Sequence, residues 1–329
     1  MKFGIVGAGA WGTALAMAVR RANADVTLWA FEAEVVESIS RDQENALYLP
    51  GVKLDRDIRA TGELGEVAAA DTILLAAPAQ HLRQTIGPLA GQLPPSIPLV
   101  ICSKGIEQDT QALMSDAVGS LFAANPFMVL SGPTFAADVA AGLPTAVTLA
   151  ADDIEAAQRV ADDLGSERFR PYSGDDVIGA QIGGAIKNVL AIACGIAEGR
   201  GFGDNARAAL ITRGLAELTR LCIAKGGRAE TMMGLSGMGD LVLTCTSTQS
   251  RNYSLGVALG QGRTLTEIMG ERNSVAEGVY TASAAVALAE KLEIEMPIAR
   301  AVDAVLNRGA NIDDVIGALL ARPLRTEAG

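Results

Sequence analysis

The stretch KFGIVGAGAWGTALAMAVRR, residues 2–21, decides the fold class. It opens with a short apolar run typical of a buried strand, continues into the motif GAGAWG with Gly7, Gly9 and Gly12 as its glycines, and ends in a helix-forming segment. Glycines in such a motif permit a tight turn and let backbone amides approach a pyrophosphate at the helix N-terminus. Because the motif stands between a strand and a helix, it indicates a dinucleotide-binding unit rather than a plain glycine turn.

The residues after the second strand-like run bear on the choice of cofactor. That run, residues 25–31, ends in Phe31 and is followed by Glu32, an acid about 20 residues beyond the glycine motif. A carboxylate here accepts hydrogen bonds from the ribose of NAD, whereas the 2′-phosphate of NADP favours a basic residue. We therefore expect NAD or NADP as cofactor, with NAD preferred. Two alternatives would weaken this preference: Arg41 could fold back toward the ribose, or Glu32 could point to solvent. No second flavin-type motif supports FAD.

The remainder of the chain divides into two kinds of segment. Apolar runs without alternation predict further strands of a parallel sheet covered on both faces; they occupy residues 71–79, 97–105, 127–133 and 145–151. Helical patterns dominate after about residue 175; they occupy residues 175–199, 204–227, 250–262 and 279–294. The sequence predicts an α/β fold, with an N-terminal Rossmann-type doubly wound sheet (residues 1–178) followed by an all-α C-terminal domain (residues 179–329).

Composition excludes several classes of protein. A chain of 329 residues is longer than one hydrophobic core usually serves, so two domains are expected. Its net charge of −11 argues against a nucleic-acid binder. No stretch approaches the 18 or so uncharged apolar residues of a membrane span, because Lys187 interrupts the best candidate, and no signal peptide precedes the first strand. The four cysteines are widely spaced without a CxxC or Cys/His cluster, so we expect no metal site and a reducing cytoplasm.

Lys187 is the leading candidate for the group that moves a proton. It lies in GAIKNVLAIACG, residues 184–195, with no acid within one helical turn in sequence. A lysine commonly extends its head to solvent from such a segment, but a buried one has a lowered pKa that suits acid/base chemistry. The chain's single histidine, His81, is the competing acid, although a lone histidine is more often structural.

Three further stretches carry charged or polar groups suited to a substrate site. Lys104 follows a predicted strand, at the sheet edge where open α/β sheets bind ligands, although it could equally be a solvated turn lysine. Asp240 is an acid between glycines in the helical half, where a turn or cap is the simpler explanation. Ser250, Arg251 and Asn252 stand at the predicted start of a helix, where free amides and an arginine favour an anion such as phosphate.

The ordered motifs resemble bacterial NAD(P)-dependent glycerol-3-phosphate dehydrogenase. The motifs are GAGAWG, YLPG, SKGIE, SGPTFAADVAAGLPTAV, GAIKNVLAIACG, GLSGMGDLVLTCTS, QSRN and VAEG, which together run from residue 7 to about 278. This family implies a Rossmann domain, a helical domain, and interconversion of dihydroxyacetone phosphate with sn-glycerol 3-phosphate for glycerophospholipid synthesis in the cytoplasm.

The resemblance also implies roles for individual residues. Lys187 would accept the proton in oxidation and donate it in reduction. Lys104 would touch cofactor and substrate, and Asp240 would help orient the Lys187 region and the substrate hydroxyls. The implied substrate contacts are completed by Gly132, Thr134, Ser250, Arg251 and Asn252. The implied cofactor contacts are Ala10, Trp11, Ala136, Arg251, Val275 and Glu277.

Two other functions stay open at this point. One is a related two-domain dehydrogenase for 3-hydroxy acids or sugar acids, which would bind a carboxylate in place of a phosphate. The other is a non-catalytic dinucleotide-sensing protein of the same fold, against which the joint presence of Lys187, Lys104 and Asp240 argues. The abundant glycine and alanine of the helical half would also suit a homodimer.

Overall fold

The computed structural model describes residues 1–271 and 276–323, and its first 174 residues build an eight-stranded sheet. The strand order across the sheet is β10-β9-β8-β7-β6-β1-β2-β5, and every neighbouring pair is parallel except β8 and β9. The strands are β1 (Lys2–Val6), β2 (Asp25–Trp29), β5 (Ile58–Thr61), β6 (Thr72–Leu75), β7 (Leu99–Ile101), β8 (Phe127–Ser131), β9 (Thr145–Ala150) and β10 (Phe169–Gly174). A separate antiparallel pair comprises β3 (Glu44–Asn45) and β4 (Leu49–Lys53).

The six apolar runs of the sequence are confirmed as β1, β2, β6, β7, β8 and β9. Two edge strands, β5 and β10, were not predicted, because neither contains a continuous apolar run. The sheet is parallel as predicted except at one place, where β9 pairs antiparallel with β8.

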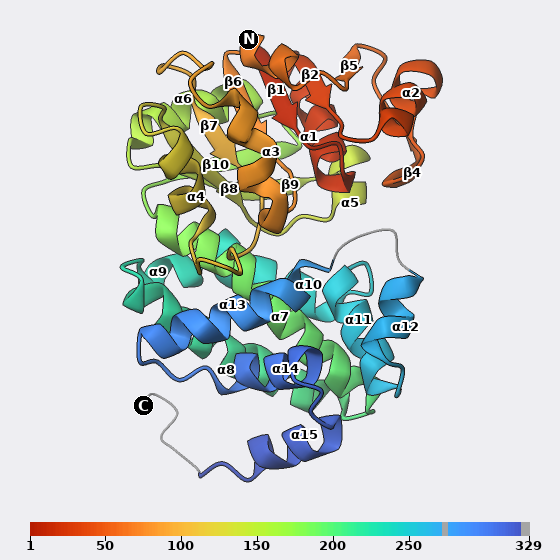
Figure 1. Cartoon of the computed structure of the whole chain (residues 1–329), viewed down its shortest axis with the longest axis vertical. Helices are drawn as coiled ribbons and strands as arrows, with labels where there is room; N and C mark the ends of the chain where they lie inside the picture. The colour runs from red at the N-terminus through yellow and green to blue at the C-terminus, as the bar shows by residue number, and fades with distance from the viewer. Residues whose placement is uncertain (272–275, 324–329) are drawn as a thin grey trace.

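Helices cover both faces of this sheet, as the predicted doubly wound arrangement requires. Consecutive strand residues face opposite ways: Leu74 belongs to the buried cluster under α1, whereas Ile73 and Leu75 belong to the cluster under α3 and α4. The helices of this half (Figure 1) are α1 (Ala10–Arg21), α2 (Ala33–Asp42), η1 (Leu64–Ala69), η2 (Ala79–His81), α3 (Leu82–Ile86), η3 (Gly87–Leu89), α4 (Met114–Leu121), α5 (Ala136–Ala140) and α6 (Ile154–Leu164).

From residue 176 to residue 323 the described chain is helical, and it forms the lower half of Figure 1. All four predicted helices are confirmed, as α7, α8, α11 and α13. The full set is α7 (Val177–Gly199), α8 (Gly203–Ala224), α9 (Ala229–Met232), η4 (Leu235–Gly239), α10 (Asp240–Thr246), α11 (Arg251–Gly260), α12 (Leu265–Gly270), α13 (Glu277–Lys291), α14 (Pro297–Asn307) and α15 (Ile312–Leu320).

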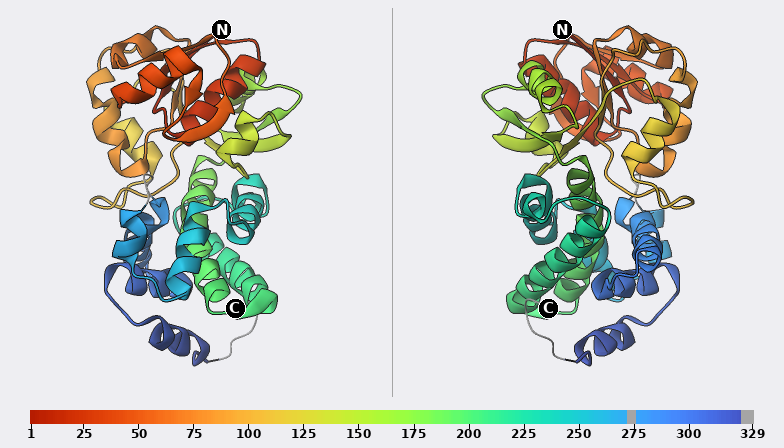
Figure 2. Two further views of the ribbon diagram at one scale, coloured as in Figure 1. Left: turned by 90° about the vertical axis from the view of Figure 1, so that its right-hand side faces the viewer. Right: turned by 90° about the vertical axis from the view of Figure 1, so that its left-hand side faces the viewer.

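Helix α7 is the central element of the helical half. It begins against the sheet and runs down through the other helices, as both side views in Figure 2 show. Among the described residues it is the one helix whose length and composition would allow a membrane span. However, 89% of its most apolar 18-residue window is buried inside the protein, so its apolar faces serve packing between helices.

The sheet order places the binding crevice. Strand β1 lies between β2 and β6; the chain leaves β1 toward β2 on one side and leaves β6 toward β7 on the other side, so the strand order reverses between β1 and β6. Open α/β sheets bind ligands at such a reversal, outside the carboxyl ends of the strands. The glycine motif follows β1 directly, and the carboxyl ends of β7 and β8 lie along the same edge.

Candidate active site

The glycine motif has the geometry that a pyrophosphate requires. Gly7 has φ +110°, and a Cβ there would lie 2.8 Å from the backbone nitrogen of Ala77. A Cβ on Gly12 would lie only 1.8 Å from the carbonyl oxygen of Gly7, whereas Gly9 faces open space. No side chain caps α1, and its first turn contains no acid. These residues therefore fit a dinucleotide, whose phosphates would meet the N-terminus of α1.

The first two residues of α1 extend this cradle. Ala10 begins the helix, and the half-buried Trp11 follows it. The indole Nε1 of Trp11 is buried and has no hydrogen-bond partner within the described structure. A buried N–H group without an acceptor is costly. The position of this one therefore agrees with a bound ligand that accepts its hydrogen bond.

Phe31 and Glu32 follow β2, at the position that bears on the choice of cofactor. Phe31 is 83% exposed, with its ring edge-on to Trp29 at a centroid distance of 6.4 Å. Glu32 does not point freely to solvent, because its Oε1 accepts a hydrogen bond of 2.7 Å from the hydroxyl of Tyr48. The alternative role of Arg41 has no support, since its guanidinium pairs with Glu37 and Asp42 on α2.

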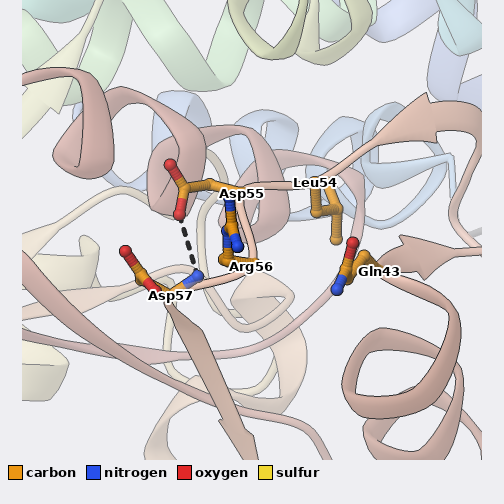
Figure 3. Close-up of a pocket in the computed structure, with 5 residues that line it drawn as sticks. All are labelled: Gln43, Leu54, Asp55, Arg56 and Asp57. Carbon is orange, nitrogen blue, oxygen red and sulfur yellow. Dashed lines mark hydrogen bonds between the residues drawn. The ribbon is translucent and has the colours of Figure 1, made fainter.

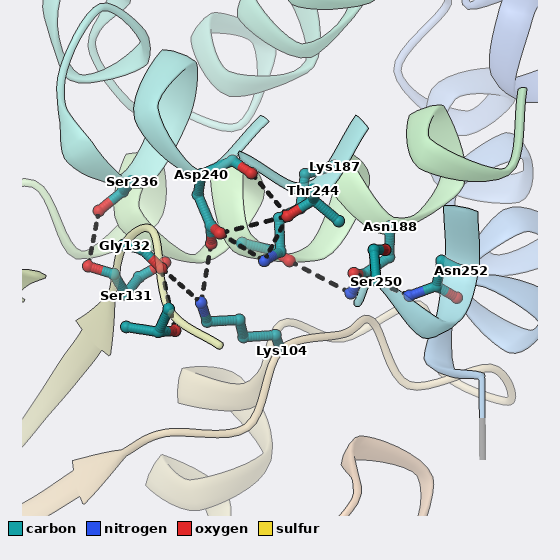
Figure 4. A network of polar contacts seen from close by, with 12 residues as sticks. Lys104, Ser131, Gly132, Lys187, Asn188, Ser236, Asp240, Thr244, Ser250 and Asn252 are labelled. Carbon is teal, nitrogen blue, oxygen red and sulfur yellow. Dashed lines mark hydrogen bonds and ion pairs between the residues drawn. The ribbon is translucent and has the colours of Figure 1, made fainter. Parts of the chain in front are cut away.

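Lys187 is buried, not directed to bulk solvent. Its side chain is 7% exposed, and Nζ donates to Asp240 Oδ1 at 2.5 Å and to Thr244 Oγ1 at 3.1 Å (Figure 4). Burial lowers the pKa of Lys187 to about 8, with the positive charge of Lys104 acting in the same direction and the Asp240 carboxylate opposing both. An ammonium group with such a pKa can give or take a proton near neutral pH.

Asp240 joins the two lysines from opposite halves of the molecule. Its side chain is 0% exposed, and its second oxygen, Oδ2, accepts from Lys104 Nζ at 2.7 Å. Lys104 also donates to the carbonyl oxygen of Gly132 at 2.9 Å, because Lys104 and Gly132 follow the neighbouring strands β7 and β8. Two ammonium groups on one carboxylate leave a net positive charge at this point, which favours an anionic substrate.

Small residues on α7 make this approach of the two halves possible. A Cβ on Gly183 would lie 2.1 Å from the carbonyl oxygen of Ser236, in the π-helical turn η4 that precedes Asp240. A Cβ on Gly184 would lie 2.8 Å from Ser131 Oγ and 3.4 Å from the side chain of Lys104. The glycines before Lys187 therefore let α7 contact η4 and the end of β8.

The start of α11 lies beside this centre. Ser250 is the N-cap of α11, as predicted, and its hydroxyl accepts from Tyr253 N at 3.2 Å. Asn252 donates to Asn188 Oδ1 at 3.0 Å, which ties it to the residue that follows Lys187. Arg251 is exposed, and desolvation by the surrounding protein lowers its pKa while Glu277 raises it.

The other residues implied by the family are distributed around this centre. Glu277 begins α13, and its Oε1 accepts a hydrogen bond of 3.1 Å from the backbone N–H of Ala79, in the segment that follows β6. The other carboxylate oxygen, Oε2, is buried and has no hydrogen-bond partner in the described part of the chain. Thr134 Oγ1 donates to the carbonyl oxygen of Gly132 at 3.2 Å. Ala136 is the first residue of α5. Val275 lies outside the described residues.

Sequence reasoning missed two polar residues of this network. Thr244 contacts Lys187 and lies four residues after Asp240, so the helical spacing of α10 was the signal that could have revealed it. The role of Asn188 could not be predicted from local sequence, because its hydrogen-bond partner Asn252 is 64 residues away. His81, the competing acid, is exposed on η2 and takes no part in the Lys187 network.

Outside this site, the described structure offers no metal centre and has hollows at two other places. No group of three His, Cys, Asp or Glu side chains there could hold a metal ion. One shallow hollow lies at the loop before β5, lined by Gln43, Leu54, Asp55, Arg56 and Asp57 (Figure 3). A groove of about 840 Å³ lies in the helical half among α7, α8, α14 and α15, and its lining is mostly apolar.

Comparison with known families and proteins agrees with this geometry. Residues 2–157 match the family model for the NAD-dependent glycerol-3-phosphate dehydrogenase N-terminus, and residues 176–317 match the model for its C-terminus. The chain is 55% identical to a glycerol-3-phosphate dehydrogenase [NAD(P)+] of Parvibaculum lavamentivorans, over 99% of this chain and 98% of that protein. It is 56% identical to the enzyme of that name from Rhodospirillum rubrum, over 99% and 93%.

Solved structures give the same picture. A glycerol-3-phosphate dehydrogenase from Coxiella burnetii superposes with a TM-score of 0.94 at 38% identity, covering 98% of this chain and 99% of that one. A ketopantoate reductase from Ralstonia eutropha superposes with a TM-score of 0.61 at 17% identity, covering 95% and 99%. At that identity the second likeness concerns the fold alone.

Proposed function

Since the chain belongs to the NAD-dependent glycerol-3-phosphate dehydrogenase family and is an NAD(P)-dependent oxidoreductase, we propose how its own residues perform the reaction. Residues 1–178 bind the dinucleotide, and residues 179–329 supply the proton donor and the phosphate site. The product, sn-glycerol 3-phosphate, serves glycerophospholipid synthesis. The single observation that carries this proposal is the buried Lys187–Asp240–Lys104 cluster at the carboxyl ends of β7 and β8.

Lys187 moves the proton. A bound NADH or NADPH supplies the hydride for the carbonyl carbon of dihydroxyacetone phosphate. Lys187 Nζ gives its proton to the carbonyl oxygen during reduction and takes a proton from the alcohol during oxidation. Asp240 accepts hydrogen bonds from Lys187 and Lys104, so it holds both Nζ atoms in place. Lys104, Gly132 and Thr134 contact the substrate on the side of the sheet.

The substrate phosphate binds at the start of α11. Ser250, Arg251 and Asn252 supply a hydroxyl, a guanidinium and an amide, and the first turn of the helix supplies backbone N–H groups. A phosphate held there, away from the reacting carbon, positions that carbon for hydride transfer. The buried hydrogen bond between Asn252 and Asn188 supports this arrangement, because it fixes the start of α11 beside Lys187.

The dinucleotide binds across the motif at residues 7–12 and reaches Phe31 and Glu32. The further residues that contact the dinucleotide are Ala10, Trp11, Lys104, Ala136, Arg251, Val275 and Glu277. NAD is preferred to NADP, because the Glu32 carboxylate would repel a 2′-phosphate and the nearby Arg41 is engaged with Glu37 and Asp42.

The test is oxidation of NADH, followed by its absorbance, with dihydroxyacetone phosphate as substrate. We expect turnover by the wild type and a loss of about 10²-fold or more for Lys187→Ala, the usual contribution of a positioned acid, with NADH binding retained. Lys291→Ala, an exposed lysine on α13, is the matched control, and His81→Ala should be mild.

Other results would contradict this assignment. Near-normal turnover by Lys187→Ala would show that another group moves the proton, and abolition of turnover by His81→Ala would identify that group. Turnover of a 3-hydroxy acid or sugar acid but not of the phosphate ester would favour the related dehydrogenases. Binding of NADH without turnover of any carbonyl substrate would favour a sensing protein.

The assembly and location of the protein are also part of the proposal. The chain forms a homodimer through its helical half, supported by the exposed apolar side chains of Phe202 and Leu320 along the groove there. It works in the cytoplasm, which agrees with four cysteines that are all free and buried. Light scattering coupled to size-exclusion chromatography would return a monomer mass if the dimer is wrong.

A further inference from the structure

The motif YLPG, residues 48–51, begins just before β4 and continues into that strand, and the proposed reaction gives it no role. Its tyrosine is partly buried, and its hydroxyl donates to Glu32 Oε1 at 2.7 Å. Glu32 follows β2 and is the N-cap residue of α2, but its carboxylate does not cap that helix. The carboxylate of Glu32 is therefore held by Tyr48 and not by its own helix.

Tyr48 is itself anchored to the glycine motif. Its backbone N–H donates to Asn45 Oδ1 at 3.0 Å, and Asn45 is fully buried. The amide nitrogen of Asn45 donates to the carbonyl oxygen of Ala8 and to Thr13 Oγ1, both at 2.8 Å. A continuous series of hydrogen bonds thus runs from Ala8 in the glycine motif through Asn45 and Tyr48 to Glu32.

The chemistry of the pair keeps its direction fixed. Burial, and then the hydrogen bond to Glu32 and the negative charge of that residue, raise the pKa of Tyr48 to about 12, so the phenol stays protonated and donates at any working pH. A partly exposed glutamate without such a partner has several rotamers open to it and can turn its charge away into solvent. With Oε1 bound to the phenol, the carboxylate keeps one place relative to the glycine motif.

We propose that Tyr48 is a specificity-determining residue: it holds the Glu32 carboxylate where a dinucleotide's ribose hydroxyls can bind it and where a 2′-phosphate is repelled. This inference rests on the proposed dinucleotide site. It goes beyond that proposal because Glu32 alone, free to turn, would discriminate weakly between the two cofactors. The discrimination comes from the tether of Glu32 to the glycine motif.

The experiment compares dissociation constants of NADH and NADPH, measured by nicotinamide fluorescence on the purified chain. Tyr48→Phe removes only the hydroxyl. We expect the ratio of the NADPH constant to the NADH constant to fall by about tenfold, the scale of one hydrogen bond to a charged group. Tyr172→Phe, the same change on an exposed tyrosine of β10, is the control and should leave the ratio unchanged.

A second variant tests the coupling. Glu32→Gln should lower the ratio by itself, and adding Tyr48→Phe to it should change the ratio little further, because the tyrosine acts through the carboxylate. Glu32→Gln also keeps the test decisive if Tyr48→Phe does not fold, since an unchanged ratio in Glu32→Gln would overturn the proposal.

Two further outcomes would overturn the inference. One is a Tyr48→Phe ratio within twofold of wild type, and the other is a ratio that rises, which would mean that the phenol weakens the repulsion by Glu32. These outcomes are separate from failure of the proposed function, because a wild type that does not reduce dihydroxyacetone phosphate still yields both dissociation constants.

Discussion

At the scale of single residues, the site depends on a charge that folding has removed from water. The apolar segment around Lys187 pointed to a lysine of unusual pKa, and burial confirms that setting. Its partner could not be paired with it from the sequence, because Asp240 lies 53 residues further along and is itself set among glycines. Local patterns therefore predicted candidate residues, whereas their joining into one cluster depended on tertiary packing.

The pKa of Lys187, lowered to about 8 chiefly by burial, predicts opposite pH profiles for the two directions of the reaction. Reduction needs the protonated lysine, so kcat/KM for dihydroxyacetone phosphate should fall as the pH rises through about 8. Oxidation of sn-glycerol 3-phosphate needs the neutral lysine, so its kcat/KM should rise through the same range. Initial rates between pH 6 and 10 at saturating cofactor would check both, and a reduction profile flat across this range would contradict the assignment.

Arg251 should affect binding of the substrate more than turnover. Charge-assisted hydrogen bonds to a phosphate contribute about 1.5–3 kcal/mol, so we expect Arg251→Ala to raise KM for dihydroxyacetone phosphate roughly ten- to hundredfold. Arg263→Ala, on the exposed loop after α11, is the matched control. NADH affinity has to be measured alongside, because Arg251 is also a proposed cofactor contact. An unchanged KM would move the phosphate elsewhere.

At the scale of elements, the sequence predicted helices more fully than their packing. The patterns gave α7, α8, α11 and α13, and Ser250 was correctly expected as a cap. They did not reveal that Gly195 and Gly199 of α7 face Gly256 and Gly260 of α11, where each added Cβ would meet the partner's backbone within 3 Å. The sequence of each helix shows that its two glycines are four residues apart. Which two helices pack together through such glycines depends on the fold.

This glycine contact predicts a coupling between packing and the phosphate site. A Cβ at residue 195 would lie 2.1 Å from the carbonyl oxygen of Tyr253, so Gly195→Ala must push α11 away. We expect a loss of about 1–3 kcal/mol in the free energy of unfolding, and a higher KM for dihydroxyacetone phosphate because the displaced helix carries residues 250–252. Urea denaturation and steady-state kinetics measure the two effects.

The control for that change is another alanine in a helix. Gly317 of α15 has nothing within 4 Å of an added Cβ, so Gly317→Ala should be neutral or stabilising by up to about 1 kcal/mol. If Gly195→Ala unfolded at the wild-type urea concentration, close packing of α7 on α11 would not be the reason for glycine there.

At the scale of the whole molecule, the sheet half and the helical half share a core. The segment from Lys104 to Leu113, between β7 and α4, belongs to the sheet half in sequence, yet Ile106 and Leu113 belong to the buried cluster of the helical half. Gln108 on this segment donates to Ser283 of α13 at 3.0 Å. The change in pattern near residue 175 predicted two kinds of domain. The sequence did not indicate that Ile106 and Leu113, in a segment of the sheet half, would be buried in the core of the helical half.

Ile106 provides the test of this shared core. It is 0% exposed and lies two residues after Lys104, so its burial in the helical half fixes the direction from which Lys104 reaches Asp240. Ile106→Ala should cost about 2–5 kcal/mol of stability and should also lower kcat in protein that remains folded, because Lys104 loses its anchor. The exposed Ile223 of α8 offers the control, since Ile223→Ala should change neither quantity appreciably. A loss of stability with unchanged kcat would mean that the segment joins the two halves without positioning Lys104.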